Sequence, residues 1–165
     1  MRLRSAVWLA LLVPVFGCAS LFGGAEDPPG GRNSAAEVRA FFLTGVEAFN
    51  RHELNRFMGQ FGADIRMYTP TGWLNGYAAV RERFSETFER FPNVHMEVDS
   101  LEARRVDENV VAVRFRWRVH PMGEGPAFHG VGTGVYVLRG SKWEEVLEHE
   151  TITLVDEPLR QAPAD

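Results

Sequence analysis

The sequence predicts an α+β fold in which three helices pack on a curved antiparallel sheet. Two observations predict it: apolar residues recur every three or four positions before residue 92, and at alternate positions after residue 94. These are the periods of an amphipathic helix and of a strand with one buried face. With 165 residues, 45% of them hydrophobic, the chain has the size of one domain that can bury a core without a disulfide or metal.

The helices are predicted from apolar spacing and from signals at their ends. Ser34-Ala35-Ala36-Glu37 matches a capping box at the start of the first helix. Gly62 ends the second helix, Asn75 caps the third, and Pro92 ends the third because proline lacks a backbone N–H. The predicted elements are helices over residues 34–49, 54–61 and 76–91, with a short strand over 64–68.

Four long strands follow, separated by turn signals. In the second of them, apolar residues from Val111 to Val119 alternate with charged residues such as Arg114 and Arg116, which predicts one buried and one solvated face. The alternation falters near Ser100, which predicts a bulge that helps to curve the sheet. The predicted strands cover residues 94–106, 110–120, 127–138 and 142–154.

The N-terminus has the layout of a secretory signal. Residues 1–17 combine two arginines with an apolar run of about a dozen residues, which is shorter than the ~20 residues needed to span a bilayer. The following Val15-Phe16-Gly17-Cys18 resembles the lipobox of bacterial lipoproteins. This resemblance implies cleavage before Cys18, a lipid anchor on that cysteine and, because Ala19 follows it, the periplasmic face of the outer membrane. The alternative is an ordinary signal peptide that is cut nearby.

The expected organisation is therefore a signal peptide, a lipidated tether, one domain and a tail. The tether is rich in Gly and Pro and lacks apolar periodicity. Removing the signal takes away two arginines and no acid, so the formal charge of −4 becomes −6. An acidic chain without a Lys/Arg run argues against nucleic acid as a partner. The four segments are 1–17, 18–33, 34–155 and 156–165.

The order of elements resembles the nuclear transport factor 2-like superfamily, and within it the SnoaL-like group. Three motifs carry the resemblance: Phe61-Gly62-Ala63-Asp64, Thr69-Pro70-Thr71-Gly72 with Gly76, and the segment from Trp143 to His149. The resemblance covers residues 35–154 and implies a cone-shaped fold with a pocket at its open end. Members include isomerases, dehydratases, polyketide cyclases and proteins without catalysis, so the fold alone assigns no activity.

Strand pairing predicts which residues face that pocket. A register set by the tight turn at Gly140-Ser141 pairs Val135 with Val146 and Thr133 with Glu148, and a neighbouring hairpin pairs Trp117 with Val131. Glu148 then lies on an apolar inner face, where desolvation raises the pKa of a carboxyl group and prepares it for acid–base chemistry. The alternative is a structural carboxylate hydrogen-bonded to Thr133 or Tyr68. The expected inner face comprises Val113, Phe115, Trp117, His129, Val131, Thr133, Val135, Val146, Glu148, Glu150 and Ile152.

The candidate catalytic residues are Glu148 and His129, because histidine exchanges protons near neutral pH. His129 has the alternative of lying at the pocket rim. Among the candidate ligand contacts, Tyr68, Trp73 and Trp117 have the alternative of ordinary core packing. No metal or other cofactor is expected, since the histidines do not share a face and no His-Glu-x-x-His motif occurs. The predicted ligand contacts are Tyr68, Trp73, Phe115, Trp117, Thr133 and Glu150.

Three functions follow as hypotheses: binding of a small, mostly apolar molecule in the cone, acid–base catalysis of the isomerase, dehydratase or cyclase type, and a dimerising domain without a ligand. The ketosteroid isomerase reaction is disfavoured, because Thr69 stands where those enzymes carry the base. The glycines at 130, 132 and 134 are expected on the outer face beside Arg114, Arg116 and Arg118, where a flat sheet would allow a homodimer. The alternative is a solvated face.

Overall fold

The computed structural model describes residues 33–156, which form three helices and one six-stranded sheet. The α+β class predicted from the sequence is confirmed. The predicted signal peptide, the tether with Cys18 and the tail beyond Asp156 lie outside the described residues. The elements are α1 (Ser34–Asn50), α2 (Leu54–Met58), β1 (Phe61–Thr69), β2 (Gly72–Asn75), α3 (Tyr77–Arg90), β3 (Val94–Asp107), β4 (Val110–Pro121), β5 (Ala127–Arg139) and β6 (Lys142–Asp156).

The strands lie in the order β2-β1-β6-β5-β4-β3. All neighbours pair antiparallel except β1 and β6, which pair parallel. The sequence did not predict the short strand β2, which pairs with the end of β1 through Tyr68 and Trp73. The second helix ends earlier than predicted, because Phe61 begins β1 and not the last turn of a helix.

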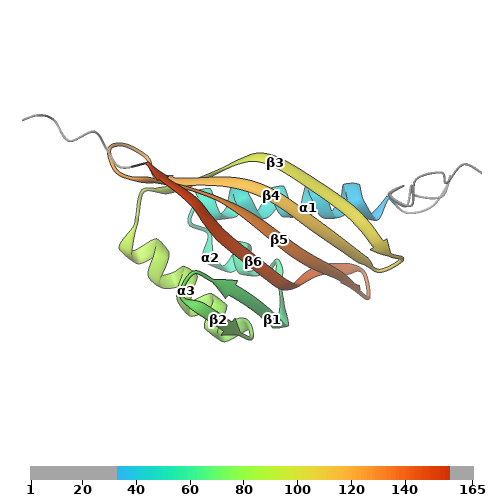
Figure 1. Cartoon of the computed structure of the whole chain (residues 1–165). Helices are drawn as coiled ribbons and strands as arrows, with labels where there is room; N and C mark the ends of the chain where they lie inside the picture. The colour runs from blue at the N-terminus through green and yellow to red at the C-terminus, as the bar shows by residue number, and fades with distance from the viewer. Residues whose placement is uncertain (1–32, 157–165) are drawn as a thin grey trace, which may run out of the picture.

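The helices cover one face of the curved sheet (Figure 1). α1 packs along β3 and β4, and α3 lies beside β1 and β2. Val38 and Phe42 of α1 pack with Phe115 and Trp117 of β4, and Phe49 packs with α2, β1 and α3 in a second cluster. The core thus lies between the helices and the inner face of the sheet. We define that inner face by its β4 and β5 residues Val111, Val113, Phe115, Trp117, Gly130, Gly132, Gly134 and Tyr136.

The prediction of which β5 side chains face the interior is wrong. The register starts at the tight turn as expected, with Leu138 opposite Trp143 and Tyr136 opposite Glu145, but a bulge then shifts it by one residue. Beyond the bulge, Thr133 pairs with His149 and Gly134 pairs with Glu148. β5 pairs with β4 without a register shift, and the inward residues Val113, Phe115 and Trp117 lie opposite Gly134, Gly132 and Gly130, so these glycines share the inner face. Val131, Thr133 and Val135 therefore belong to the outer face.

The glycines of β5 consequently lie inside, against the aromatic rings of β4. A Cβ on Gly130 would lie 2.2 Å from the Trp117 ring, and one on Gly132 would lie 2.2 Å from the Phe115 ring. The absence of side chains on β5 is what leaves room for these rings to lie over its backbone. The expected flat outer face of glycines is thus also wrong.

Two local predictions can be compared directly with the structure. The register of β3 and β4 shifts between Val98 and Ser100, which confirms the predicted bulge. The cap of α1 lies one residue earlier than the capping box predicts, because the Asn33 side chain accepts a hydrogen bond from the N–H of Ala36 at 3.0 Å. Within residues 33–156, none of the helices combines the length and apolar character that crossing a membrane requires.

Candidate functional site

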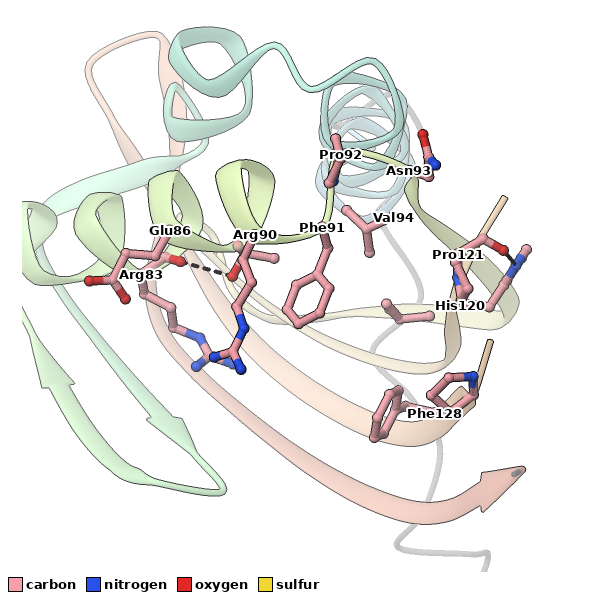
Figure 2. A pocket seen from close by; sticks show the side chains of 13 residues that line it. Arg83, Glu86, Arg90, Phe91, Pro92, Asn93, Val94, His120, Pro121 and Phe128 are labelled. Atoms are coloured by element: carbon pink, nitrogen blue, oxygen red, sulfur yellow. Dashed lines mark hydrogen bonds between the residues drawn. The ribbon is translucent and has the colours of Figure 1, made fainter. Parts of the chain in front are cut away.

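A cavity of the domain lies where α3 ends and approaches the β4–β5 connection (Figure 2). Its volume is about 570 Å³. One wall is the C-terminal half of α3 and the segment after it, and the other is the end of β4 and the start of β5. Pro92 terminates the helix, because proline cannot donate a helical hydrogen bond, and so turns the chain across the end of the cavity. We call this cavity the end pocket.

The walls of the end pocket are mainly apolar, with charge concentrated on α3. Its apolar residues are Phe91, Pro92, Val94, Val119, Pro121, Pro126 and Phe128. Its polar residues are Arg83, Glu86, Thr87, Arg90, Asn93 and His120. His120 is held by its own strand end: Nδ1 lies 2.8 Å from the Pro121 carbonyl oxygen, and Nε2 lies 3.4 Å from Glu97 Oε1. The pocket thus offers a large apolar surface and a small number of fixed polar groups.

A second, much smaller cavity of about 30 Å³ lies deeper, between the helices and the inner face. This volume has room for about one water molecule. Three carboxyl groups of β6 line it, Glu145, Glu148 and Glu150. The bulge in β6 explains their unequal spacing, because the strand changes its inward parity between Glu145 and Glu148. We call these three residues the acid cluster.

Burial is the main cause of the raised pKa values in the acid cluster. Burial raises the pKa of Glu145 to about 8, although the Tyr136 hydroxyl lowers it by donating a hydrogen bond to Oε2 at 2.9 Å. Burial also raises the pKa of Glu148 well above its ordinary value, and the charges of Glu145 and Glu150 add to the effect. The second oxygen of Glu145, Oε1, is buried with no hydrogen-bond partner among residues 33–156. Burial therefore favours the protonated form of these carboxyl groups.

Arg83 belongs to the end pocket and also affects the titration of two carboxyl groups of the acid cluster. It lines the end pocket, and its charge lowers the pKa of Glu148 and of Glu150 against the larger effect of burial. The guanidinium remains more than 4.0 Å from both carboxylates, since neither forms an ion pair with it. Its Nε atom is buried with no hydrogen-bond partner in the described part of the chain.

The structure brings together only some of the residues that the sequence proposes for the site. Glu148 is 7% exposed and faces inward, as expected, and it lines the small cavity together with Phe115 and Glu150. Trp117 also faces inward and is buried in the core. No residue among these four lines the end pocket.

The other proposed residues lie elsewhere, and their expected positions are corrected. Thr133 lies on the outer face, opposite Arg114 of β4 and His149 of β6, so it cannot hydrogen-bond Glu148. The rings of Tyr68 and Trp73 contact each other at an interplanar angle of 60°, with their centres 5.0 Å apart, and both side chains are exposed, Trp73 by 50%. His129 contacts Asp156 at 2.8 Å near the end of β6, away from the acid cluster.

Sequence reasoning missed the residues that form the end pocket. Arg83 and Arg90 are separated by seven residues, two turns of helix, so this spacing in the third predicted helix could have placed both on one face. Glu145 and Tyr136 were missed because the β6 bulge is invisible in the alternation pattern. Among residues 33–156, no group of three or more His, Cys, Asp or Glu side chains is arranged to hold a metal ion.

Comparison of the chain with known protein families identifies its family. A model of the SnoaL-like domain matches residues 38–146. The chain belongs to the SnoaL-like domain family. The resemblance of its sequence to this family is thereby confirmed. No match to a curated protein was found.

Solved structures similar to this SnoaL-like domain share its nuclear transport factor 2-like, or cystatin-like, fold. A nuclear transport factor 2-like protein of unknown function from Pseudomonas putida KT2440 has a TM-score of 0.66 and 15% identity, over 72% of this chain and 85% of that one. A protein with a cystatin-like fold from Caulobacter vibrioides has a TM-score of 0.66 and 18% identity, over 74% and 92%. The type 3 hexachlorocyclohexane dehydrochlorinase from Novosphingobium barchaimii LL02 has a TM-score of 0.67 and 12% identity, over 80% and 94%.

Proposed function

We propose that this SnoaL-like domain binds a small, mostly apolar molecule in the end pocket. The observation that carries the proposal is the cavity of about 570 Å³ with walls formed largely by aromatic, valine and proline side chains. Pockets for small molecules typically measure about 300–1,000 Å³ and combine apolar walls with a few polar groups. We therefore propose the ligand site at the end of α3, and not on the inner-face residues that the sequence suggested.

Binding of N-phenyl-1-naphthylamine, a neutral dye that fluoresces in apolar surroundings, tests this proposal. We expect saturable binding with one site per chain. Val119→Trp fills the pocket and should weaken binding at least tenfold, whereas Val106→Trp makes the same change at an exposed position and should leave it unaltered. Thermal melts of both variants establish that they are folded. Absence of saturable binding, or equal binding by a folded Val119→Trp variant, would contradict the proposal.

Acid–base catalysis is a second candidate, favoured by one observation. Glu148 is buried with a raised pKa, as a general acid or base near neutral pH requires. A dehydrochlorinase is among the proteins with a similar fold, although its 12% identity carries no residue roles. The small size of the adjoining cavity makes binding, and not catalysis, our leading proposal.

Exchange of the α-hydrogens of 2-tetralone for deuterium tests the catalytic candidate. In this reaction a base removes a proton from the carbon next to the carbonyl group, and a deuteron from solvent replaces it. A catalytic Glu148 predicts that the protein accelerates exchange and that Glu148→Gln abolishes the acceleration. Exchange at the buffer rate, or equal rates for both proteins, would exclude this reaction type for Glu148.

We further propose that the domain is tethered to the bacterial cell envelope through a lipid on Cys18. The support is the sequence of residues 1–18, with its basic start, apolar run and lipobox-like end. Several acyl chains on one residue would anchor the protein stably, because each buried CH₂ contributes about 0.8 kcal/mol. The Gly- and Pro-rich segment 19–33 would then separate the domain from the membrane surface.

A further inference from the structure

The end pocket contains two arginines that protrude from one face of α3. Arg83 and Arg90 are two helical turns apart, and both line the pocket. Figure 2 shows both guanidinium groups extending from the same side of α3, with Phe128 on the other wall of the cavity. Positive charge is thus placed at one end of an otherwise largely apolar space.

Neither arginine has a carboxylate partner within residues 33–156. By contrast, Arg118 pairs with Glu97 at 3.1 Å and Arg139 pairs with Asp64 at 2.7 Å. The Arg90 guanidinium instead lies 5.4 Å from the centre of the Phe91 ring. Arg83 has its Nε donor buried without a hydrogen-bond partner in that region.

The acidic groups near these arginines do not neutralise the pocket. Glu86 also lines the cavity, but in Figure 2 its carboxylate points away from the two guanidinium groups. Glu148 and Glu150 line the small cavity and not the end pocket, and burial raises the pKa of both, which favours their uncharged forms. The end pocket therefore has an excess of positive charge beside its apolar walls.

We propose that the ligand of the end pocket is a small organic acid, whose carboxylate or sulfonate is held by Arg83 and Arg90 while its apolar body lies against Phe91, Val119 and Phe128. A planar guanidinium presents parallel N–H donors that match the oxygens of such a group. Arg90, at the more exposed end of α3, supplies the charge that an entering anion meets first, and Arg83 supplies a second positive charge in the wall of the pocket. This inference rests on the proposed function and adds the chemical class of the ligand.

Two dyes with the same aromatic body test it. 1-Anilinonaphthalene-8-sulfonate is N-phenyl-1-naphthylamine with one added sulfonate, so the ratio of their dissociation constants isolates the contribution of the negative charge. We expect the full-length protein to bind the sulfonate at least tenfold more tightly than the neutral dye. Arg90→Gln and Arg83→Gln should each bring this ratio close to one. Arg81→Gln removes the same charge from α3 at a residue that does not line the pocket and should preserve the ratio.

The outcomes separate the inference from the function on which it rests. Similar affinities for the two dyes in the unmodified protein, or a preference for the sulfonate that persists in both Arg83→Gln and Arg90→Gln, would overturn the inference and leave the pocket a binding site for neutral molecules. Sulfonate binding that survives Val119→Trp would place that dye outside the pocket and also overturn it. Failure of the neutral dye to bind would contradict the proposed function itself.

Discussion

At the residue scale, Glu145 links the pH of the solution to the stability of the fold. Burial raises the pKa of this carboxyl group to about 8 from an ordinary value of 4.5. The folded state thus holds a proton that the unfolded chain releases at lower pH. By linkage, this group's contribution to stability is complete below about pH 4.5 and is lost as the pH rises through about 8. Burial shifts the pKa of Glu148 and of Glu150 in the same direction.

We therefore predict that the melting temperature falls between pH 5 and pH 9 and that Glu145→Gln reduces this fall. The amide stays neutral and can still accept the hydrogen bond of Tyr136. Each kcal/mol of ionisation cost removed should raise Tm by about 2–4 °C at pH 9. Melting curves of both proteins across this pH range measure the effect, with Glu124→Gln, in an exposed loop, as the control. Parallel pH profiles for Glu145→Gln and the unmodified protein would contradict the prediction.

A second residue-scale prediction distinguishes the two faces of β5. Gly132→Ala places a methyl group 2.2 Å from the Phe115 ring, so the ring must move and the packing is strained. We expect a loss of about 1–3 kcal/mol in the free energy of unfolding. Val131→Ala alters the next residue, which is 41% exposed, and should change stability by about 0.5 kcal/mol or less. Urea denaturation measures both, and the reverse order of effects would support the face assignment made from sequence alone.

At the element scale, the first turn of α1 depends on Asn33. Its side chain accepts the N–H of Ala36, one of the donors that a helix start leaves unpaired. Asn33→Ala should therefore lower the free energy of unfolding by about 1 kcal/mol, while Asn33→Asp retains an acceptor and should not. Denaturant titration of the two variants checks this. Equal stability of Asn33→Ala and the unmodified protein would show that the cap contributes nothing.

The elements also show how far the sequence could predict this fold. The helices, the four long strands and the Ser100 bulge followed from periodicity and turn residues, because each depends on local spacing. The bulge in β6 could not be predicted in this way. The residues around Val135 and Tyr136 are compatible both with a continuous register and with one shifted by a residue. Only the packing of Phe115 and Trp117 over the β5 glycines decides between the two registers.

The difference between local spacing and the packing of distant segments also explains which residues of the candidate site could be predicted. Glu148 and Glu150 could be placed inside because they alternate with exposed residues on β6. The end pocket could not be predicted, because it is formed by segments distant in the sequence, with Arg83 and Phe91 on one wall and Phe128 on the other. Its position depends on how α3 docks against the sheet, which the sequence pattern does not specify.

At the scale of the whole molecule, the outer face of the sheet is the surface through which we propose a homodimer. Leu147 and Val131 are 40% and 41% exposed there, and none of the helices lies over this face in Figure 1. A second copy would bury these side chains. We predict a dimeric mass by light scattering, and a monomeric mass for Leu147→Lys but not for Val106→Lys, a control at an exposed position near the end of β3. A monomeric unmodified protein would exclude this interface.

Attachment to the envelope is the last whole-molecule prediction, and it separates the tether from the domain. If Cys18 carries the anchor, Cys18→Ser should move the full-length protein from the membrane fraction to the soluble fraction, because lipids attached to that residue are the proposed membrane contact. The folded domain should be unaffected, so the variant should bind N-phenyl-1-naphthylamine with unchanged affinity. Cell fractionation with detection of the protein measures the first effect, and dye titration of the purified variant measures the second. Continued membrane association of a Cys18→Ser protein from which residues 1–17 have been cleaved, as its intact mass would show, would contradict lipid anchoring through this cysteine.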